Sequence, residues 1–365
     1  MSKMRFVLSE FPDPKLEEAA IIRRLMAFQT CLQNKRLFSA QMSKSAENNI
    51  RSDWTLTNND IPKALEIRIR RWAKKIHRNH MKRVGLTHLS PDDLQMLKPC
   101  RDGADIFELR NLHHADEIAA ALHAEYPWLS DATTYVWQSL RQNCRNGRPG
   151  AHFAPVLLDG PPGIGKSAWA RSLAQLLGAP EMIIDATVEN ASFSLVGSQR
   201  GWSNSMPGRL LSFMLRSSVA NPLVVIDEIE KSGVPTSAKG RTFSLPDALL
   251  PLLEGMTARS WTCPYFQCGF DMSSINWVLT SNNHRDLPEP LLSRLHVIKL
   301  KTLSRDHLRQ FITREAVKRK LSSESTENVA TTIDQACRDG YQIDLRTVIR
   351  ALELAENQQS RSTLH

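Results

Sequence analysis

Apolar residues recur at spacings of three and four over the first part of the chain, which predicts amphipathic helices. From Pro14 to about Arg110 the best candidates are Ala19–Phe28, Pro62–Arg83 and Pro91–Leu97. Ser90 precedes the last of these, followed by Pro91 and two acids, an order typical of an N-cap and a first helical turn. The N-terminal part is therefore predicted to be mainly helical.

The pattern changes after the linker Asn146–Gly150. Short apolar runs of strand length now alternate with helical stretches, and a helix at Ser167–Leu177 is ended by Gly178. Strands separated by helices predict an α/β fold, with a parallel sheet covered on both faces. The predicted strands are Ala154–Asp159, Met182–Ala186, Leu223–Asp227 and Ile275–Ser281. Beyond Thr302 amphipathic helices return, up to a polar tail at Gln358–His365.

Composition excludes several classes of protein. With 41% hydrophobic and 23% charged residues the chain can bury a core, so wholesale disorder is excluded. It has neither an apolar run of about 20 residues nor a signal peptide, so we expect a cytoplasmic protein with no membrane partner. Among six cysteines only Cys263 and Cys268 are close, and no second pair completes a zinc site. We expect free thiols there.

The net charge of +9 is concentrated between Lys63 and Arg83, where nine basic residues meet one acid. One interpretation is a solvated helix face, with Leu65, Ile69, Trp72 and Ile76 buried on the other side. The other is a surface that binds nucleic acid or an acidic partner. The first interpretation is favoured.

A phosphate-binding loop follows the first predicted strand. The motif G-x-x-x-x-G-K-[ST] requires a strand before it and a helix after it, and both are predicted here. Backbone N–H groups would surround the phosphates, the lysine would contact the β- and γ-phosphates, and the serine hydroxyl would bind Mg²⁺. The matching residues are Gly160, Pro161, Pro162, Gly163, Ile164, Gly165, Lys166 and Ser167.

Two acids end the strand Leu223–Asp227. Asp227 is predicted to hold the magnesium shell together with Ser167, and Glu228 to polarise the attacking water. The chain is therefore predicted to bind ATP with Mg²⁺ and to hydrolyse it.

The order of these motifs resembles the AAA+ ATPases, and among them the ATPase module of the Lon proteases. The resemblance covers about Tyr126 to Glu356. Besides the loop and the acids it rests on Ser205-Met-Pro-Gly-Arg209, Asp227-Glu-Ile-Glu-Lys231, Phe270-Asp-Met-Ser273, Thr280-Ser-Asn282 and Leu287-Pro-Glu-Pro-Leu-Leu-Ser-Arg294.

The resemblance implies roles for further residues. Asn282 would be the first sensor of the γ-phosphate or water, and Arg294 an arginine finger reaching a neighbouring subunit's nucleotide. Arg346 would be the second sensor, and Tyr126 would line the adenine pocket or belong to the core. Trp202 and Ser203 align with an aromatic pore loop that grips an unfolded chain, although Ser203 replaces the usual aliphatic residue.

The helical pattern of the first part, which has no counterpart in the resemblance, and the resemblance of the rest together predict three parts: a helical N-terminal region for recognition (1–115), an α/β ATPase subdomain (116–301) and an all-α lid (302–365). We expect a ring, with a hexamer favoured, that remodels a protein substrate or works with a separate effector chain. Only about twenty residues follow Arg346, so no peptidase domain is expected. The alternatives are an ATPase directed to nucleic acid by the basic helix, and an ATP-binding switch or scaffold with slow turnover.

Overall fold

The computed structural model describes residues 2–44, 62–84, 86, 88–148, 150–188, 192–201, 205–233 and 244–360, with backbone only for 37–44 and 360. The chain divides into two compact units. One comprises Ser9–Gln95, and the other Met1–Leu8 together with Met96–His365. Each unit is described by itself.

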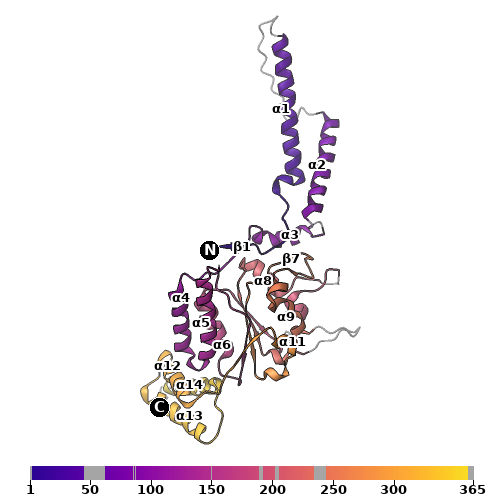
Figure 1. The fold of residues 1–365 in the computed structure, drawn as a ribbon. Coiled ribbons are helices and arrows are strands. Elements are labelled where there is room, and N and C mark those ends of the chain that lie inside the picture. Colours follow the sequence, from indigo (N-terminus) through magenta and orange to yellow (C-terminus); the bar gives the residue numbers. More distant parts are fainter. Residues whose placement is uncertain are drawn as a thin grey trace. The chain divides into compact units, whose positions relative to one another are not determined.

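The unit Ser9–Gln95 is built on two long helices that pack together, α1 (Glu18–Lys44) and α2 (Lys63–Val84) (Figure 1). Ile21 of α1 is buried, as are Ile69 and Ala73 of α2. A short helix η1 (Pro14–Leu16) precedes α1, and its Leu16 carbonyl lies 3.0 Å from Nδ1 of His77 on α2. The predicted N-terminal helices are therefore present, the first much longer than its pattern indicated.

The expected buried face of α2 was partly wrong. Trp72 is 56% exposed and Ile76 42% exposed, while Leu65 is half-buried. The buried seam centres on Ile69 and Ala73, one turn apart on the same face. Trp72 and Ile76 follow these positions by three residues each, which places them at the edge of the seam.

The larger unit contains a five-stranded, all-parallel sheet in the order β4-β5-β8-β3-β9. The strands are β3 (Val156–Asp159), β4 (Glu181–Asp185), β5 (Leu223–Asp227), β8 (Asn276–Ser281) and β9 (His296–Lys299). Every residue of β3 and β8 is buried, as expected for strands covered on both faces.

Helices cover both faces of this sheet, with α4, α5 and α6 on one side and α8, α9 and α11 on the other (Figure 1). They span Leu112–Glu125, Ser130–Arg145 and Lys166–Leu177 on the first side, and Arg209–Ser217, Leu245–Leu253 and Glu289–Leu292 on the second. Trp169 of α6 is fully buried and donates a hydrogen bond to Thr133 of α5 (3.0 Å). The fold is therefore α/β, as predicted.

Three C-terminal helices follow the sheet: α12 (Arg305–Lys318), α13 (Ser323–Arg338) and α14 (Leu345–Ser360). The remaining elements are short. They are β1 (Lys3–Met4), α3 (Pro91–Leu97), η3 (Lys98–Cys100), β2 (Ala104–Asp105), η4 (Pro127–Leu129), α7 (Ser192–Val196), η5 (Ile229–Lys231), α10 (Gly255–Ala258), β6 (Trp261–Thr262), β7 (Gly269–Phe270) and η6 (His284–Asp286).

Most predicted elements of the α/β part were confirmed to within two residues, and α3 has the predicted bounds. Helices α4 and α5 and strand β9 were not predicted. None of the six cysteines forms a disulfide, and the backbone N–H of Cys263 donates to the carbonyl of Cys268 (3.1 Å) at the β6–β7 hairpin. The described residues hold no cluster of three or more histidine, cysteine, aspartate or glutamate side chains that could bind a metal ion. None of their helices combines the length and apolar character that a membrane crossing requires.

Candidate functional site

The loop Gly160–Ser167 connects β3 to α6 at the carboxyl edge of the sheet. Gly163 (φ +73°) and Gly165 (φ +92°) adopt left-handed backbone conformations that favour glycine. A Cβ at Gly163 would also lie 2.6 Å from the Cβ of Asp344, just before α14. The Gly163 carbonyl accepts a hydrogen bond from the Leu345 backbone (3.0 Å). The glycines thus permit both the turn and the close approach of α14.

Lys166 is almost fully buried at the start of α6. Its ammonium group donates to the carbonyls of Gly160 (2.5 Å) and Pro161 (3.0 Å) and to Oδ1 of Asn282 (3.0 Å). Burial lowers the pKa of Lys166, while nearby acids, Glu230 foremost, oppose that shift. The carbonyls of the loop thus accept hydrogen bonds from the Lys166 ammonium group, a cation suited to binding phosphate.

Three hydroxyl and carboxyl groups meet beside this lysine. Oδ1 of Asp227, at the end of β5, accepts hydrogen bonds from Ser167 (2.7 Å) and Thr280 (2.5 Å). Thr280 reaches Asp227 because β8 lies beside β5, with Ile226 paired to Leu279. A carboxylate beside two hydroxyls is a set of hard oxygen donors, which is the chemistry that Mg²⁺ prefers.

Glu228 follows β5 in a left-handed conformation (φ +52°), unusual for a residue other than glycine. Its backbone N–H donates to Oγ1 of Thr280 (3.0 Å). Its carboxylate accepts hydrogen bonds from Lys231 (2.7 Å) and from the amide of Asn282 (3.3 Å). The bond from Lys231 is the main reason that the pKa of Glu228 lies below its usual range, so the carboxylate is held ionised, as a base requires.

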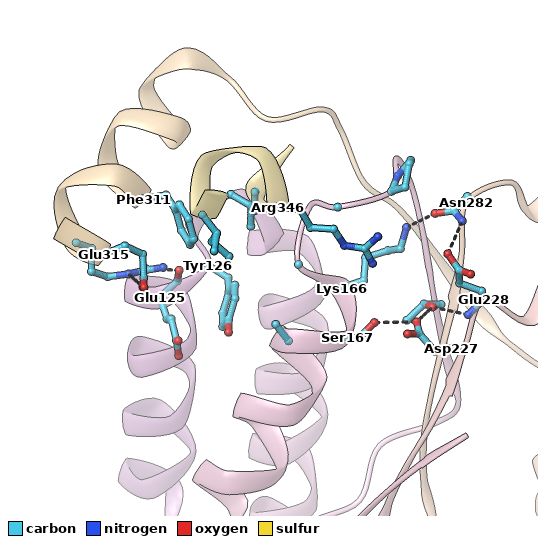
Figure 2. A pocket seen from close by; sticks show the side chains of 18 residues that line it. Glu125, Tyr126, Lys166, Ser167, Asp227, Glu228, Asn282, Phe311, Glu315 and Arg346 are labelled. Atoms are coloured by element: carbon cyan, nitrogen blue, oxygen red, sulfur yellow. Dashed lines mark hydrogen bonds and ion pairs between the residues drawn. The ribbon is translucent and has the colours of Figure 1, made fainter. Parts of the chain in front are cut away.

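Asn282, just after β8, connects the lysine to the acids. Besides accepting from Lys166, it donates to Oε1 of Glu230 from its backbone N–H (3.0 Å) and from its side-chain amide (2.9 Å). Figure 2 shows Lys166, Asn282 and Glu228 in sequence along one side of the pocket. Glu230 therefore fixes which end of the Asn282 amide faces Lys166.

A cavity of about 350 Å³ joins these groups to an apolar region under the C-terminal helices. Tyr126, Phe311 and Ile349 line the apolar part, and Arg346 extends from α14 between it and Lys166 (Figure 2). Tyr126 is 6% exposed, and its hydroxyl lies 3.1 Å from Oγ of Ser172. Tyr126 is therefore both a core residue and a wall of the cavity, whose two ends suit a base and a chain of phosphates.

Arg314 of α12 closes the apolar end. Its guanidinium donates to the carbonyls of Glu125 and of Ala124 (3.3 Å), in the last turn of α4, and lies 5.4 Å from the centre of the Phe311 ring. A cation at a helix C-terminus satisfies free carbonyls and the helix dipole.

Ten of the predicted site residues line this cavity. They are Tyr126, Pro162, Gly163, Gly165, Lys166, Ser167, Asp227, Glu228, Asn282 and Arg346. Gly160 and Pro161 contribute carbonyls to Lys166, and Ile164 is buried with its carbonyl accepting from Trp128 (2.8 Å).

Arg294 does not line the cavity of its own chain. It pairs instead with Glu254 (2.9 Å) and donates to the carbonyl of Pro290 (2.8 Å). The predicted pore-loop residues Trp202 and Ser203 lie outside the described residues.

Several residues of the site were not predicted, among them Phe311 and Ile349 of the apolar wall and the polar residues Thr280, Glu230 and Arg314. Thr280 and Glu230 lie within motifs of the resemblance, but only their contacts with Asp227 and Asn282 reveal a part in the site. Arg314 had no signal in the sequence, because its partners are backbone carbonyls far away in the chain.

Comparison with known proteins agrees with this geometry. The family "ATPase family associated with various cellular activities (AAA)" matches residues 156–303. The peroxisomal Lon protease homolog 2 of Oryza sativa subsp. indica is 34% identical over 156 residues, which cover 43% of this chain and 17% of that protein. The Lon protease of Mycoplasma pneumoniae is 34% identical over 168 residues, 46% of this chain and 20% of that protein. The chain thus spans about a fifth of the length of these relatives.

Among solved structures, a cryo-EM reconstruction of Hsp104 in a closed state with ATPγS and FITC casein contains a similar chain. The TM-score is 0.50 at 15% identity, over 77% of this chain and 50% of that chain, so the likeness concerns the fold alone. The region that the AAA family matches, residues 156–303, coincides with the parallel sheet and its phosphate-binding loop. The chain therefore contains an ATPase domain of the AAA family, and over that domain its relatives include the Lon proteases.

Proposed function

We propose that this chain binds ATP with Mg²⁺ and hydrolyses it. The observation that carries the proposal is that one cavity is lined by all five of these residues: Lys166, Ser167, Asp227, Glu228 and Asn282. Lys166 would contact the phosphates, and Ser167 and Asp227 would hold Mg²⁺, which neutralises phosphate charge when bound. Glu228 would take a proton from the attacking water, which Asn282 would orient.

We further propose that the chain works as a ring, with a hexamer favoured. Arg294 lies outside the nucleotide cavity of its own chain. This supports a role as an arginine finger that completes the site of a neighbouring subunit. The relationship to Lon proteases supports a protein as the substrate that the ring remodels. The division into regions 1–115, 116–301 and 302–365, for recognition, hydrolysis and lid, belongs to this proposal.

Two substitutions test hydrolysis. Glu228→Gln should retain ATP binding and lose turnover, because only the group that accepts the water's proton is removed. Lys166→Ala is the matched control and should lose binding itself, since the phosphates lose their main cationic partner. Nucleotide affinity and phosphate release are measured for both. Turnover at the wild-type rate by Glu228→Gln would refute the assignment of the base.

The Glu228→Gln protein also provides a trap. A ring that holds ATP without hydrolysing it should retain its protein substrate, which mass spectrometry of the captured material identifies. Capture should disappear when Lys166→Ala is added to the same chain, because a ring that binds no ATP cannot hold the substrate in an ATP-dependent way. Equal capture by both proteins would argue against an ATP-gated grip.

A separate prediction concerns Trp202. If its loop grips the substrate, Trp202→Ala should leave ATPase rate and assembly nearly unchanged and abolish unfolding of the trapped protein. Truncation of a core tryptophan would instead cost about 3–5 kcal/mol and lower the melting temperature. A thermal melt, an ATPase rate and an unfolding assay on this variant distinguish the two, and normal unfolding would end the pore-loop assignment.

A further inference from the structure

Helix α2 carries a line of basic residues that the nucleotide site does not use. Arg68, Arg71, Lys75, Arg78 and Lys82, the basic stripe, follow one another at spacings of three and four, so they lie along one face of the helix. All five are exposed. At 1.5 Å per residue the basic stripe is about 21 Å long. The single acid of α2, Glu66, is paired with Arg70 outside the stripe (2.8 Å).

An aromatic side chain lies at the edge of this stripe. Trp72 is 56% exposed, and the Arg68 guanidinium lies 5.7 Å from the centre of its ring. Ile76, one turn further along, is 42% exposed. Their exposure beside five cations is the feature that the helical pattern alone predicted wrongly. The exposed Trp72 ring and the basic stripe therefore lie next to each other on the surface of α2.

We propose that this face of α2 binds single-stranded nucleic acid. A regular row of cations without an intervening acid matches a polymer that carries one negative charge at every residue. An exposed indole gives an unpaired base a surface to stack on, which neither a phosphate backbone nor a duplex needs. A proteinaceous acidic partner explains the charges but not their regularity along the helix. The proposal is independent of ATP hydrolysis, so its failure leaves the proposed function unaffected.

The test uses the full-length chain and fluorescence anisotropy with labelled single-stranded DNA and RNA oligonucleotides. If the five cations each contact a phosphate, log K should fall against log salt with a slope of about −3.5, at about −0.7 per phosphate. A duplex of the same length and an acidic peptide of the same net charge are measured in parallel. Tighter binding of either than of the single strands would overturn the proposal.

Charge variants locate the contact. In the triple variant Arg71→Gln/Lys75→Gln/Arg78→Gln the slope of log K against log salt should become less steep by about 2, at about 0.7 per lost phosphate contact. The matched control neutralises three exposed cations of α1, Arg23→Gln/Arg24→Gln/Lys35→Gln. The control should keep the wild-type slope, and equal losses in both variants would overturn the assignment to α2.

Trp72 distinguishes stacking from charge alone. Trp72→Ala should weaken oligonucleotide binding by roughly five-fold or more at unchanged salt slope, whereas Trp72→Phe should retain most of it. ATPase rate and melting temperature should be unchanged in both variants, because the side chain is exposed and distant in sequence from the nucleotide site. Affinity unchanged in Trp72→Ala would remove the single-strand assignment.

Discussion

Shared acceptor atoms organise the nucleotide site at the scale of single residues. One oxygen of Asp227 accepts from Ser167 and Thr280, and one oxygen of Glu230 accepts twice from Asn282. Hydrogen bonds to charged groups are worth more than neutral ones, about 1.5–3 kcal/mol. Two carboxylates therefore position the groups around Lys166, and only Asp227 was assigned a role from the sequence.

Glu230 is predicted to act as a positioning residue. Glu230→Ala should release the Asn282 amide and lower kcat about 10-fold with little change in KM, since one charge-assisted hydrogen bond is worth about 1.5–3 kcal/mol. Steady-state ATPase kinetics measure this division.

The conservative variant Glu230→Gln provides the control. It keeps an acceptor oxygen for Asn282 while removing the charge, so kcat should recover most of its wild-type value. Equal rates in the Ala and Gln variants would mean that orientation of Asn282 is not what Glu230 contributes.

At the scale of elements, the contact between α12 and the end of α4 forms the apolar wall of the cavity. Arg314 of α12 caps the last carbonyls of α4, and the next residue after those carbonyls is Tyr126. Phe311 lies one turn before Arg314 in α12, and the Arg314 guanidinium lies 5.4 Å from the centre of the Phe311 ring. One arginine between two helices therefore contacts both the backbone that precedes Tyr126 and the ring of Phe311.

Arg314→Met should loosen this wall. We expect nucleotide affinity to fall about 10-fold, the scale of a lost charged hydrogen bond, while kcat at saturating ATP changes little. Titration of a fluorescent ATP analogue measures the affinity. Arg314→Lys should recover part of it, because a single ammonium replaces only some of the guanidinium's donors. Wild-type affinity in Arg314→Met would contradict this account.

At the scale of the whole molecule, the role proposed for Arg294 as an arginine finger would require a neighbouring subunit. In its own chain it is held by Glu254, so action as a finger means exchanging that carboxylate for a phosphate on the next subunit. Both partners are oxygen anions that a guanidinium binds well, and the exchange therefore needs no new chemistry.

Arg294→Ala should leave ATP affinity close to normal and reduce turnover by about 10³ or more, the range known for arginine fingers. Mixing it with Lys166→Ala protein should restore part of the activity, since an intact finger then meets an intact pocket across an interface. Activity is followed against mixing ratio, with mixed assembly checked by native mass spectrometry. A mixture no more active than its components would exclude a finger in trans.

The sequence by itself determined the parts of this protein that are local. The loop Gly160–Ser167, strand β5 with its terminal acids, and helices α3 and α6 all follow from residues adjacent in the chain. Backbone conformation, capping and the period of apolar residues act over a few residues, so these elements can be predicted without knowing their neighbours.

The tertiary structure alone decided which of these parts meet. Placing β8 between β5 and β3 brings Asn282 to Lys166 and Glu230, and the contact of α12 with the end of α4 gives Arg314 its partners and places Phe311 and Tyr126 in one cavity wall. On α2, the seam with α1 buried Ile69 and left Trp72 exposed, although both fit the same helical period. Such contacts join residues far apart in the chain, and their geometry depends on how whole faces pack, which no short stretch of sequence encodes.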